Sequence, residues 1–390
     1  MTPAPIVEAR QTVRELQSSL IRDVANAGMG NNDILRFWFG ESDQPTPLFI
    51  RAAAIASLES GETFYSQNLG RPYLREAIGN YLSALHERPV AAERVAAVGS
   101  GVSALMLASQ LVLSPGDKVV AVTPLWPNVV EIPKILGAAV TRVPLAIASG
   151  RWSLDLDRLL DALTPDTRLL IVNSPNNPTG WTIEDDELDV VLAHCRKLGI
   201  WVLADDVYER LVYDPARKSA PSFLRRYEEG DRIISSNSFS KAWTMTGWRM
   251  GWLVAPEALM ADLTKLIEYN TSCILEPAQR AGAVAVAKGE GEVAKLRERL
   301  AASRRVLVDG LRRLPGVDVP DAGGAMYAFF RLAGHDDSLE LAKTLVREVG
   351  LGLAPGNAFG PEGEGWLRWC HAVEPARIEQ GLTRLRKFLA

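Results

Sequence analysis

Lys241 is the first residue in this sequence whose setting indicates chemistry. It ends the segment Ser238-Phe239-Ser240-Lys241, among small, aromatic and apolar residues. Partial burial in such surroundings lowers the pKa of a lysine amine and makes it a nucleophile. Arg249 follows shortly after, and its guanidinium, together with nearby serine hydroxyls, could bind a phosphate. Taken alone, the lysine could equally be a surface residue and the arginine half of a surface salt bridge.

Two more polar residues follow buried apolar runs. Asp205 ends the run that begins at Trp201, where a carboxylate is costly unless a cation or a hydrogen-bond donor meets it. A protonated pyridine nitrogen would be such a partner, and capping of a following helix is the alternative. Asn177 lies in the segment Asn176-Asn177-Pro178-Thr179-Gly180. Turn-forming residues explain most of that segment, but Asn177 could also direct its amide into a cleft.

A glycine-rich turn, Gly99-Ser100-Gly101-Val102-Ser103-Ala104, follows another apolar run and begins a helical pattern. Its backbone N–H groups could approach a phosphate at the helix N-terminus. The same pattern suggests a dinucleotide site, which expects an acidic residue about 20 positions further on. The next strand ends at Trp126 instead, and an aromatic ring suits stacking on a flat cofactor. We therefore set a nicotinamide-dependent dehydrogenase aside, and a plain strand–helix turn remains the other alternative.

Short apolar runs alternate with amphipathic stretches and must position these groups. We expect buried strands at 95–98, 118–122, 138–145, 168–174, 201–206, 232–236 and 248–254. Buried runs separated by helices indicate an α/β fold with a mostly parallel sheet. Ligands bind at the carboxyl ends of the strands in such sheets. The turns that carry the candidate site residues described above should therefore meet at one edge of the sheet.

The pattern changes after about residue 285. A long amphipathic helix is expected over 292–314, and short strand-like pieces follow it, which indicates a second, smaller α+β domain. At 390 residues the chain exceeds the usual size of one hydrophobic core. We expect an N-terminal arm with part of the small domain at 1–48, a large cofactor-binding domain at 49–285 and a small C-terminal domain at 286–390.

The N-terminal segment carries apolar residues at helical spacing from Ile6 to Val24, which predicts one packing helix that ends near Gly28 and Gly30. It lacks the apolar core of a signal peptide. No apolar run reaches the length of about 18 residues that a membrane span needs. The net charge of -4 gives no basic face for nucleic acid. The few scattered cysteines and histidines show no metal-ligand spacing, and a reducing cytoplasm is the simplest location.

Together these motifs resemble the class I and II aminotransferases of pyridoxal-phosphate fold type I. The resemblance covers nearly the whole chain in the expected order. Besides the motifs above, it rests on Gly40-Glu41-Ser42-Asp43, Tyr65, Gly70–Ile78, Asp205–Glu209, Gly324–Tyr327, Pro355–Gly360 and Leu367-Arg368-Trp369. It implies a large domain with a mostly parallel seven-stranded sheet flanked by helices, plus a smaller α+β domain. It also implies pyridoxal 5'-phosphate (PLP) as the cofactor and a homodimer with shared active sites.

The resemblance further implies that an amino group passes from an L-amino acid to a 2-oxo acid by a ping-pong mechanism. Lys241 would hold PLP as a Schiff base and later move a proton between the substrate Cα and the cofactor C4′. Asp205 would keep the pyridine nitrogen protonated, so that the ring accepts carbanion charge. The remaining cofactor-binding residues would be Tyr208 and Asn177 at the phenolic oxygen, Trp126 on the ring, Gly101, Val102, Ser238 and Arg249 at the phosphate, and Tyr65 reaching in from a partner subunit.

For the substrate, the resemblance implies that the fork of Arg368 binds the α-carboxylate, helped by Asn177 and the backbone N–H of Gly40. Trp126 would also border this site. Ser42 stands where the family usually has proline, near the substrate entrance, so substrate choice stays open. The aromatic run 37–39 could line a side-chain pocket or pack in the core. No second arginine for a side-chain carboxylate is identified, which leaves specificity for acidic substrates unsupported.

The same fold also hosts β-lyases and other enzymes that direct the Cα carbanion differently. The motifs bind the cofactor and do not decide between these outcomes. A cofactor-binding domain of a transcriptional regulator would need a DNA-binding module, and no basic winged-helix pattern precedes Gly40. We therefore expect an enzyme that acts on amino acids and 2-oxo acids.

Overall fold

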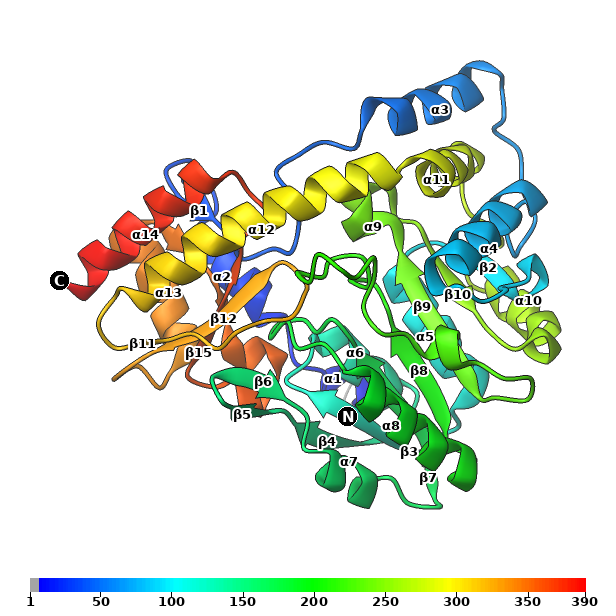
Figure 1. Cartoon of the computed structure of the whole chain (residues 1–390), viewed down its shortest axis with the longest axis horizontal. Coiled ribbons are helices and arrows are strands. Elements are labelled where there is room, and N and C mark those ends of the chain that lie inside the picture. The colour runs from blue at the N-terminus through cyan, green and yellow to red at the C-terminus, as the bar shows by residue number, and fades with distance from the viewer. Residues whose placement is uncertain (1–6) are drawn as a thin grey trace, which may run out of the picture.

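The computed structural model describes residues 7–390, and its centre is a seven-stranded sheet (Figure 1). The strand order is β2 (Val95–Val98), β10 (Gly251–Val254), β9 (Ile233–Ser238), β8 (Trp201–Asp205), β7 (Thr167–Asn173), β3 (Lys118–Thr123) and β4 (Ala139–Pro144). Only β10 runs antiparallel to its neighbours. The predicted α/β fold with a mostly parallel seven-stranded sheet is confirmed.

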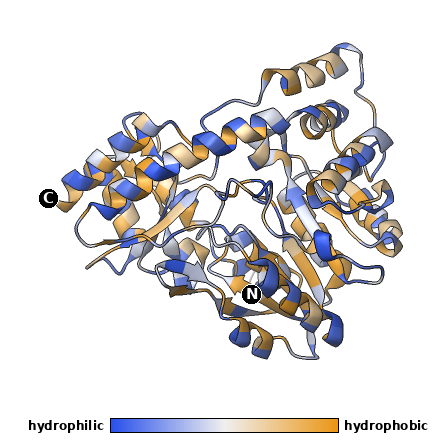
Figure 2. Ribbon diagram, viewed as in Figure 1, coloured by the Kyte–Doolittle hydropathy of each residue, from blue (hydrophilic) through white to orange (hydrophobic). Residues whose placement is uncertain are grey.

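Helices cover both faces of this sheet, which explains why its strands are continuous apolar runs. On one face, alternate residues such as Val119 and Ile171 pack in a core against helices α5 (Gly101–Val112), α6 (Pro127–Ile135) and α10 (Met260–Glu268). On the other face, Val120 and Leu170 belong to a core that includes α8 (Asp185–Leu198). In Figure 2 the central strands are largely hydrophobic, whereas the outer helices alternate between hydrophobic and hydrophilic residues.

A third core lies at the β2 edge of the sheet. It joins strands β2 and β10 to the helices α3 (Leu48–Glu59), α4 (Pro72–His86) and α11 (Glu276–Lys288). The shorter helical elements elsewhere in the chain are α7 (Leu156–Ala162), α9 (Phe239–Ala242), η1 (Ala92–Arg94), η2 (Phe223–Arg226), η3 (Thr246–Trp248), η4 (Glu257–Leu259), η5 (Gly356–Phe359) and η6 (Pro361–Gly363). The predicted strand 248–254 is shorter than expected, because residues 246–248 form η3 and the strand begins at Gly251.

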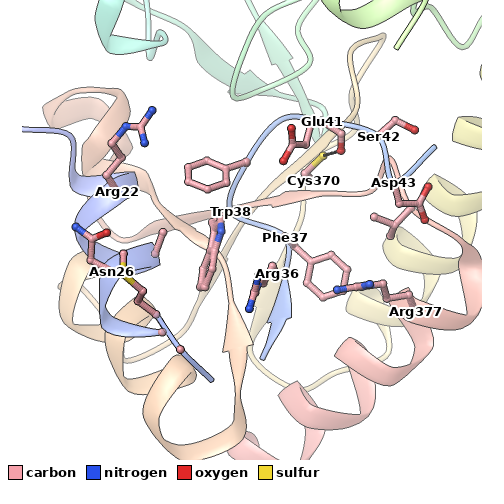
Figure 3. Close-up of a pocket in the computed structure, with 16 residues that line it drawn as sticks. Arg22, Asn26, Arg36, Phe37, Trp38, Glu41, Ser42, Asp43, Cys370 and Arg377 are labelled. Carbon is pink, nitrogen blue, oxygen red and sulfur yellow. Dashed lines mark hydrogen bonds between the residues drawn. The ribbon is translucent and has the colours of Figure 1, made fainter. Parts of the chain in front are cut away.

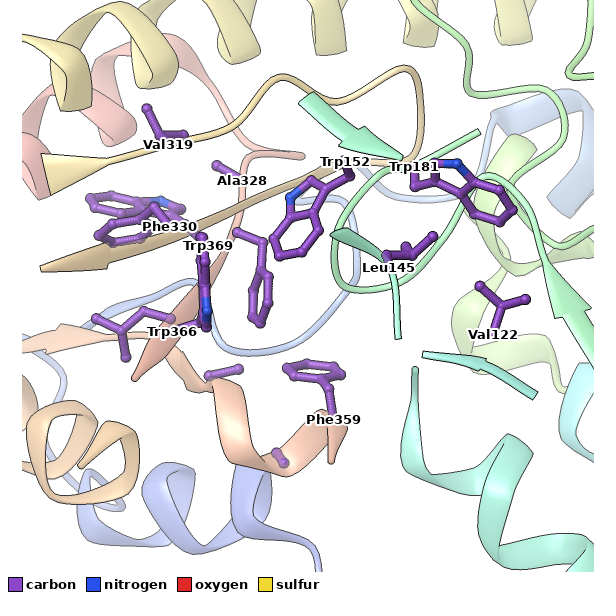
Figure 4. Close-up of a cluster of buried hydrophobic side chains, with 14 of the residues drawn as sticks. Val122, Leu145, Trp152, Trp181, Val319, Ala328, Phe330, Phe359, Trp366 and Trp369 are labelled. Carbon is purple, nitrogen blue, oxygen red and sulfur yellow. The ribbon is translucent and has the colours of Figure 1, made fainter. Parts of the chain in front are cut away.

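The C-terminal region forms a smaller antiparallel sheet with helices, as predicted. Its strands are β11 (Val317–Asp318), β12 (Tyr327–Leu332), β15 (Trp366–Cys370) and β14 (Ala354–Pro355), and its helices are α12 (Glu290–Arg312), α13 (Ser338–Val349) and α14 (Pro375–Leu389). A hairpin of β5 (Ala146–Ala148) and β6 (Arg151–Ser153) packs Trp152 on Trp366, with ring centroids 5.0 Å apart (Figure 4). The main core therefore continues from the central sheet into the smaller one.

The N-terminal segment differs from the single helix that was predicted. It forms two helices, α1 (Gln11–Arg14) and α2 (Leu20–Ala27), and Ile6 lies outside the described residues. The continuous helix is wrong because Ser19 caps a new helix, its hydroxyl accepting from the backbone N–H of Arg22. The predicted end is confirmed, since Gly28 is the C-terminal cap.

The segment after α2 joins the two ends of the chain. Strand β1 (Leu35–Arg36) pairs in parallel with β13 (Leu351–Gly352), and the loop that carries Gly40 follows it. Along residues 7–390, no helix is both long enough and apolar enough to cross a lipid bilayer.

Candidate active site

A cavity of about 690 Å3 lies at the carboxyl ends of the central strands. The ends of β7, β8 and β9, the start of α5 and the loop after β1 all contribute to its wall. It brings together every predicted site residue except Tyr65: Gly40, Gly101, Val102, Trp126, Asn177, Asp205, Tyr208, Ser238, Lys241, Arg249 and Arg368. Parallel strands deliver these side chains to one place because their carboxyl ends meet at the same edge.

Lys241 lies in the short helix α9, directly after β9. Its Nζ donates a hydrogen bond to the backbone carbonyl of Gly40. Burial is the main cause that lowers the pKa of this amine to about 8, with Arg368 and Arg249 acting in the same direction and Cys370 and Glu41 against it. An amine with such a pKa has a substantial neutral fraction at physiological pH and can act as a nucleophile.

Asp205 is the last residue of β8 and is buried. The side-chain amide of Asn173 donates to its carboxylate over 3.2 Å. Burial raises the pKa of Asp205 to about 7, against hydrogen bonds and the Lys241 charge that lower it. The helix-capping alternative is wrong, since the chain after β8 turns and reaches no helical element until η2. A cationic partner in the cavity would offset the cost of this buried charge.

The N-terminus of α5 presents backbone donors to the cavity. Its first amide groups, those of Gly101 and Val102, have no acceptor within the helix. A Cβ on Gly101 would lie only 3.1 Å from the Cβ of Ser238, so glycine allows the helix to start close to β9. Arg249 is exposed, and within residues 7–390 its guanidinium bonds only to the carbonyl of Thr246, at 2.8 Å. These donors suit a phosphate group.

Tyr208 and Trp126 are two of the aromatic residues that line the cavity. Tyr208 is buried, and its hydroxyl lies 2.6 Å from the hydroxyl of Tyr327. Burial raises its pKa well above the ordinary value of a tyrosine. The backbone N–H of Trp126 donates to the carbonyl of Asn177 over 3.0 Å, which fixes two of the predicted residues against each other.

This set of groups fits PLP. The α5 amides and Arg249 match its phosphate, the buried carboxylate of Asp205 matches a pyridinium nitrogen, and Lys241 offers the amine that an aldehyde needs. Without a cationic ligand, the carboxylate of Asp205 would remain buried with no ion-pair partner among residues 7–390. The lack of an ion-pair partner for this buried carboxylate is the observation on which the fit of PLP depends.

Arg368 is a second cation in the wall of the cavity. It lies on β15 and is only 2 % exposed. One Nη donates to the side-chain oxygen of Asn177 over 3.0 Å and the other donates to the carbonyl of Trp38, while Nε has no partner. The rings of Tyr327 and Phe359 lie 4.5 and 4.9 Å from the guanidinium. None of the carboxylates in residues 7–390 forms an ion pair with it, so a substrate carboxylate would supply the missing counter-charge.

Tyr65 is absent from the cavity of its own chain. It lies between α3 and α4 and is 90% exposed. Five other large apolar side chains in α3 or in the 269–275 region are also exposed: Leu48, Ile55, Leu58, Tyr269 and Leu275.

Several cavity residues were not assigned a role from the sequence. Tyr327 belongs to the quoted Gly324–Tyr327 motif, but the motif gave no sign that its hydroxyl meets Tyr208. Of the aromatic run 37–39, Phe37 and Trp38 are buried in the core, whereas Phe39 is partly exposed and lines the cavity. Arg22 lines it as well, from α2. No sequence pattern indicates which side of a short capped helix faces a distant cavity.

Comparison with known proteins adds the evolutionary relationship. Residues 32–385 match the family described as aminotransferase class I and II. A probable N-acetyl-LL-diaminopimelate aminotransferase of Bacillus subtilis is 32% identical over 96% of this chain and 94% of its own. An aspartate aminotransferase of Pyrococcus horikoshii is 30% identical over 96% and 95%.

Solved structures agree with this match. Aspartate aminotransferase from Thermus thermophilus with maleate superposes with a TM-score of 0.92 at 27% identity, covering 98% of this chain and 100% of that one. N-succinyldiaminopimelate aminotransferase from Mycobacterium tuberculosis gives a TM-score of 0.91 at 27% identity, with the same coverage.

Proposed function

Because this chain belongs to the class I and II aminotransferases, a family of PLP-dependent enzymes, we propose that it moves an amino group from an L-amino acid to a 2-oxo acid in a ping-pong reaction. The observation that carries the proposal is that one cavity holds the low-pKa amine of Lys241 and the buried carboxylate of Asp205. When bound, PLP supplies an electron sink for the carbanion that forms at the substrate Cα.

Lys241 has two tasks in this proposal. Its amine would hold PLP covalently in the resting enzyme. With the substrate bound in its place, the freed amine would be the base that moves a proton between the substrate Cα and the cofactor C4′. Its pKa of about 8 suits both tasks, because a general base works best when its pKa lies near the operating pH.

The other residues bind and orient. Asp205 would keep the pyridine nitrogen protonated. An ion pair with that nitrogen would stabilise the negative charge of the buried Asp205 carboxylate. Tyr208 and Asn177 would bind the phenolic oxygen, and Trp126 would stack on the ring. The amides of Gly101 and Val102, the hydroxyl of Ser238 and the guanidinium of Arg249 would bind the phosphate.

On the substrate side, Arg368 binds the α-carboxylate, with Asn177 and the backbone N–H of Gly40. A second copy of the chain completes the site, with Tyr65 reaching the neighbouring phosphate. The exposed Tyr65 and the apolar side chains near it support such an interface. We further propose a cytoplasmic location and a division into an arm with part of the small domain at 1–48, a large domain at 49–285 and a small domain at 286–390.

Two experiments test the function. Borohydride reduction of the PLP-loaded protein followed by peptide mapping should place the cofactor on Lys241, and a label elsewhere would contradict the proposal. A panel of amino donors with 2-oxoglutarate then decides the reaction type. Transamination yields the keto acid of each donor, whereas a β-lyase yields ammonia and pyruvate.

A further inference from the structure

Arg142 joins the central sheet to the turn that follows β14 of the smaller sheet. It lies on β4, at the edge of the central sheet, whereas η5 and η6 of this turn lead from β14 to β15. Its Nε donates to Glu362 over 2.8 Å, and one Nη donates both to Glu362 over 2.7 Å and to the carbonyl of Phe359 over 3.0 Å. The two charged side chains are only 22% and 19% exposed. A fork of this kind is stronger than an ordinary surface ion pair.

The backbone of the turn is shaped to receive this arginine. Gly360 has a φ of 114°, which favours glycine, and a Cβ there would lie only 2.6 Å from Cζ of Arg142. Burial raises the pKa of Glu362, but hydrogen bonds and the charge of Arg142 outweigh burial and hold this pKa below its usual range. The pair is therefore charged at physiological pH, and Arg142 is a fixed part of the turn.

Phe359 connects the turn to both halves of the active site. Its buried ring lies 4.9 Å from the guanidinium of Arg368. Its carbonyl also accepts from the backbone N–H of Leu125 over 3.0 Å, and the next residue, Trp126, donates to the carbonyl of Asn177. One residue thus contacts the arginine proposed to bind the substrate carboxylate and the segment proposed to stack on the cofactor.

Arg142 and Glu362 lie outside the space that a substrate can occupy. Neither lines the active-site cavity, nor the second cavity of about 500 Å3 that adjoins it at Phe39 and Glu41 (Figure 3). Arg142 can therefore act on a substrate only through the residues that it holds in place.

We propose that Arg142 is a positioning residue, which fixes Phe359 and through it the guanidinium of Arg368 relative to the cofactor site. An amino acid must approach Lys241 with its amine while its carboxylate stays on Arg368. The spacing of these two sites therefore determines how well it binds and reacts. This inference rests on the proposed function and deepens it, because it names what holds the carboxylate-binding arginine in register.

The first arm of the test compares two arginines with equal contacts. Arg196 on α8 lines neither cavity, but it also forks onto a carboxylate, that of Asp231, over 2.8 and 2.7 Å, and donates to the carbonyl of Arg226 over 2.8 Å. Arg142→Met and Arg196→Met should both lower the urea concentration at the midpoint of unfolding. Calorimetric titration of the PLP-loaded proteins with butyrate should show roughly tenfold weaker binding in Arg142→Met alone.

The second arm separates the carboxylate site from the cofactor site. The absorbance of the bound cofactor is followed as 2-aminobutyrate or propylamine is added. The half-saturating concentration of 2-aminobutyrate should rise roughly tenfold in Arg142→Met. That of propylamine, which has the amine but no carboxylate, should stay at the wild-type value. A variant that is merely less stable would not distinguish the two amines.

A third arm identifies the route. If Arg142 acts through Phe359, adding Arg142→Met to Phe359→Leu should weaken butyrate binding by much less than tenfold. Arg142→Lys should recover only part of the affinity, since it keeps the charge and loses the fork. Wild-type butyrate affinity in Arg142→Met, an equal loss in Arg196→Met, or a full tenfold additional loss in the double variant would overturn the inference. If no donor yields a keto acid, the proposed reaction fails, and the butyrate titrations still decide the role of Arg142.

Discussion

The hydroxyl groups of Tyr208 and Tyr327 lie 2.6 Å apart. Tyr208 follows the central strand β8, whereas Tyr327 begins β12 of the smaller sheet. The ring of Tyr327 also lies 4.5 Å from the guanidinium of Arg368. One side chain thus positions both the group that should bind the cofactor oxygen and the group that should bind the substrate carboxylate.

Tyr327→Phe should shift the pH dependence of the bound cofactor's absorbance to higher pH. Without the Tyr327 hydroxyl, Tyr208 becomes a weaker donor to the phenolic oxygen, which then holds its proton more tightly. Absorbance titration of the holoenzyme measures this shift. We also expect the free energy of unfolding to fall by about 1 kcal/mol, since a buried hydrogen bond is lost. Tyr227→Phe is the control, because the Tyr227 hydroxyl makes no hydrogen bond within residues 7–390. A cofactor spectrum that titrates as in the wild type would show that the Tyr327 hydroxyl does not act on the cofactor through Tyr208.

Lys241→Ala should abolish the absorbance band of the cofactor–lysine linkage and reduce transamination by at least about 100-fold, the contribution of one general base. Loss of the covalent bond between the lysine and the cofactor should reduce transamination further. Lys295→Ala, an exposed lysine on α12, should behave as the wild type. Turnover near the normal rate in Lys241→Ala would show that another group performs the proton transfer.

Asp205→Asn should still bind PLP but react slowly, because an amide cannot hold the pyridine nitrogen in its protonated form. Spectroscopic titration with PLP and single-turnover kinetics separate the two effects. A normal single-turnover rate in the variant would remove Asp205 from the mechanism.

The pKa of Asp205 also predicts how stability depends on pH. In the cofactor-free protein this pKa is raised from 3.8 to about 7 by burial. Between these values the folded state holds a proton that the unfolded state has lost, so stability falls as pH rises from about 4 to 7. The loss at completion is roughly 2–4 kcal/mol. Urea unfolding at pH 5.5 and 7.5 should show a smaller loss in Asp205→Asn, and equal losses in the two proteins would refute this assignment.

Gly40→Ala should disturb the substrate loop. A Cβ at this position would lie 2.0 Å from the Tyr327 hydroxyl, so the loop or the tyrosine must move. We expect KM for the amino donor to rise and the free energy of unfolding to fall by about 1–3 kcal/mol. Gly291→Ala, where a Cβ meets nothing within 4 Å, is the control. Steady-state kinetics measures KM, and urea unfolding measures the free energy of unfolding. An unaltered KM would show that the loop accommodates the methyl group without a change in the site.

The central fold could be predicted closely from the sequence because strands buried on both faces are continuous apolar runs. The error at 248–250 has a local cause. Trp248 and Met250 are apolar, but Arg249 between them adopts a left-handed conformation with φ of 51°, which ends any strand there. The N-terminal helix was wrong because helical spacing continued across Ser19, whose capping hydrogen bond no periodicity reports.

The candidate site could be predicted as far as its motifs extend. Strand-end residues such as Asp205 and Lys241 come together because topology requires it. Contacts between segments that are far apart in the sequence could not be predicted. The Arg22–Phe39 and Tyr208–Tyr327 pairs depend on how α2 and the smaller sheet pack. The role of Tyr65 in a partner subunit and the domain division remain predictions.

The parallel pair of β1 and β13 has a consequence for the newly made protein. Leu35 pairs with Leu351, and the loop with Gly40 follows directly. During synthesis, β1 cannot form this pair until Leu351 and Gly352 have been made. A chain that ends before Leu351 lacks the partner of β1, so we expect its substrate loop to stay unformed and the product to be inert toward amino acids.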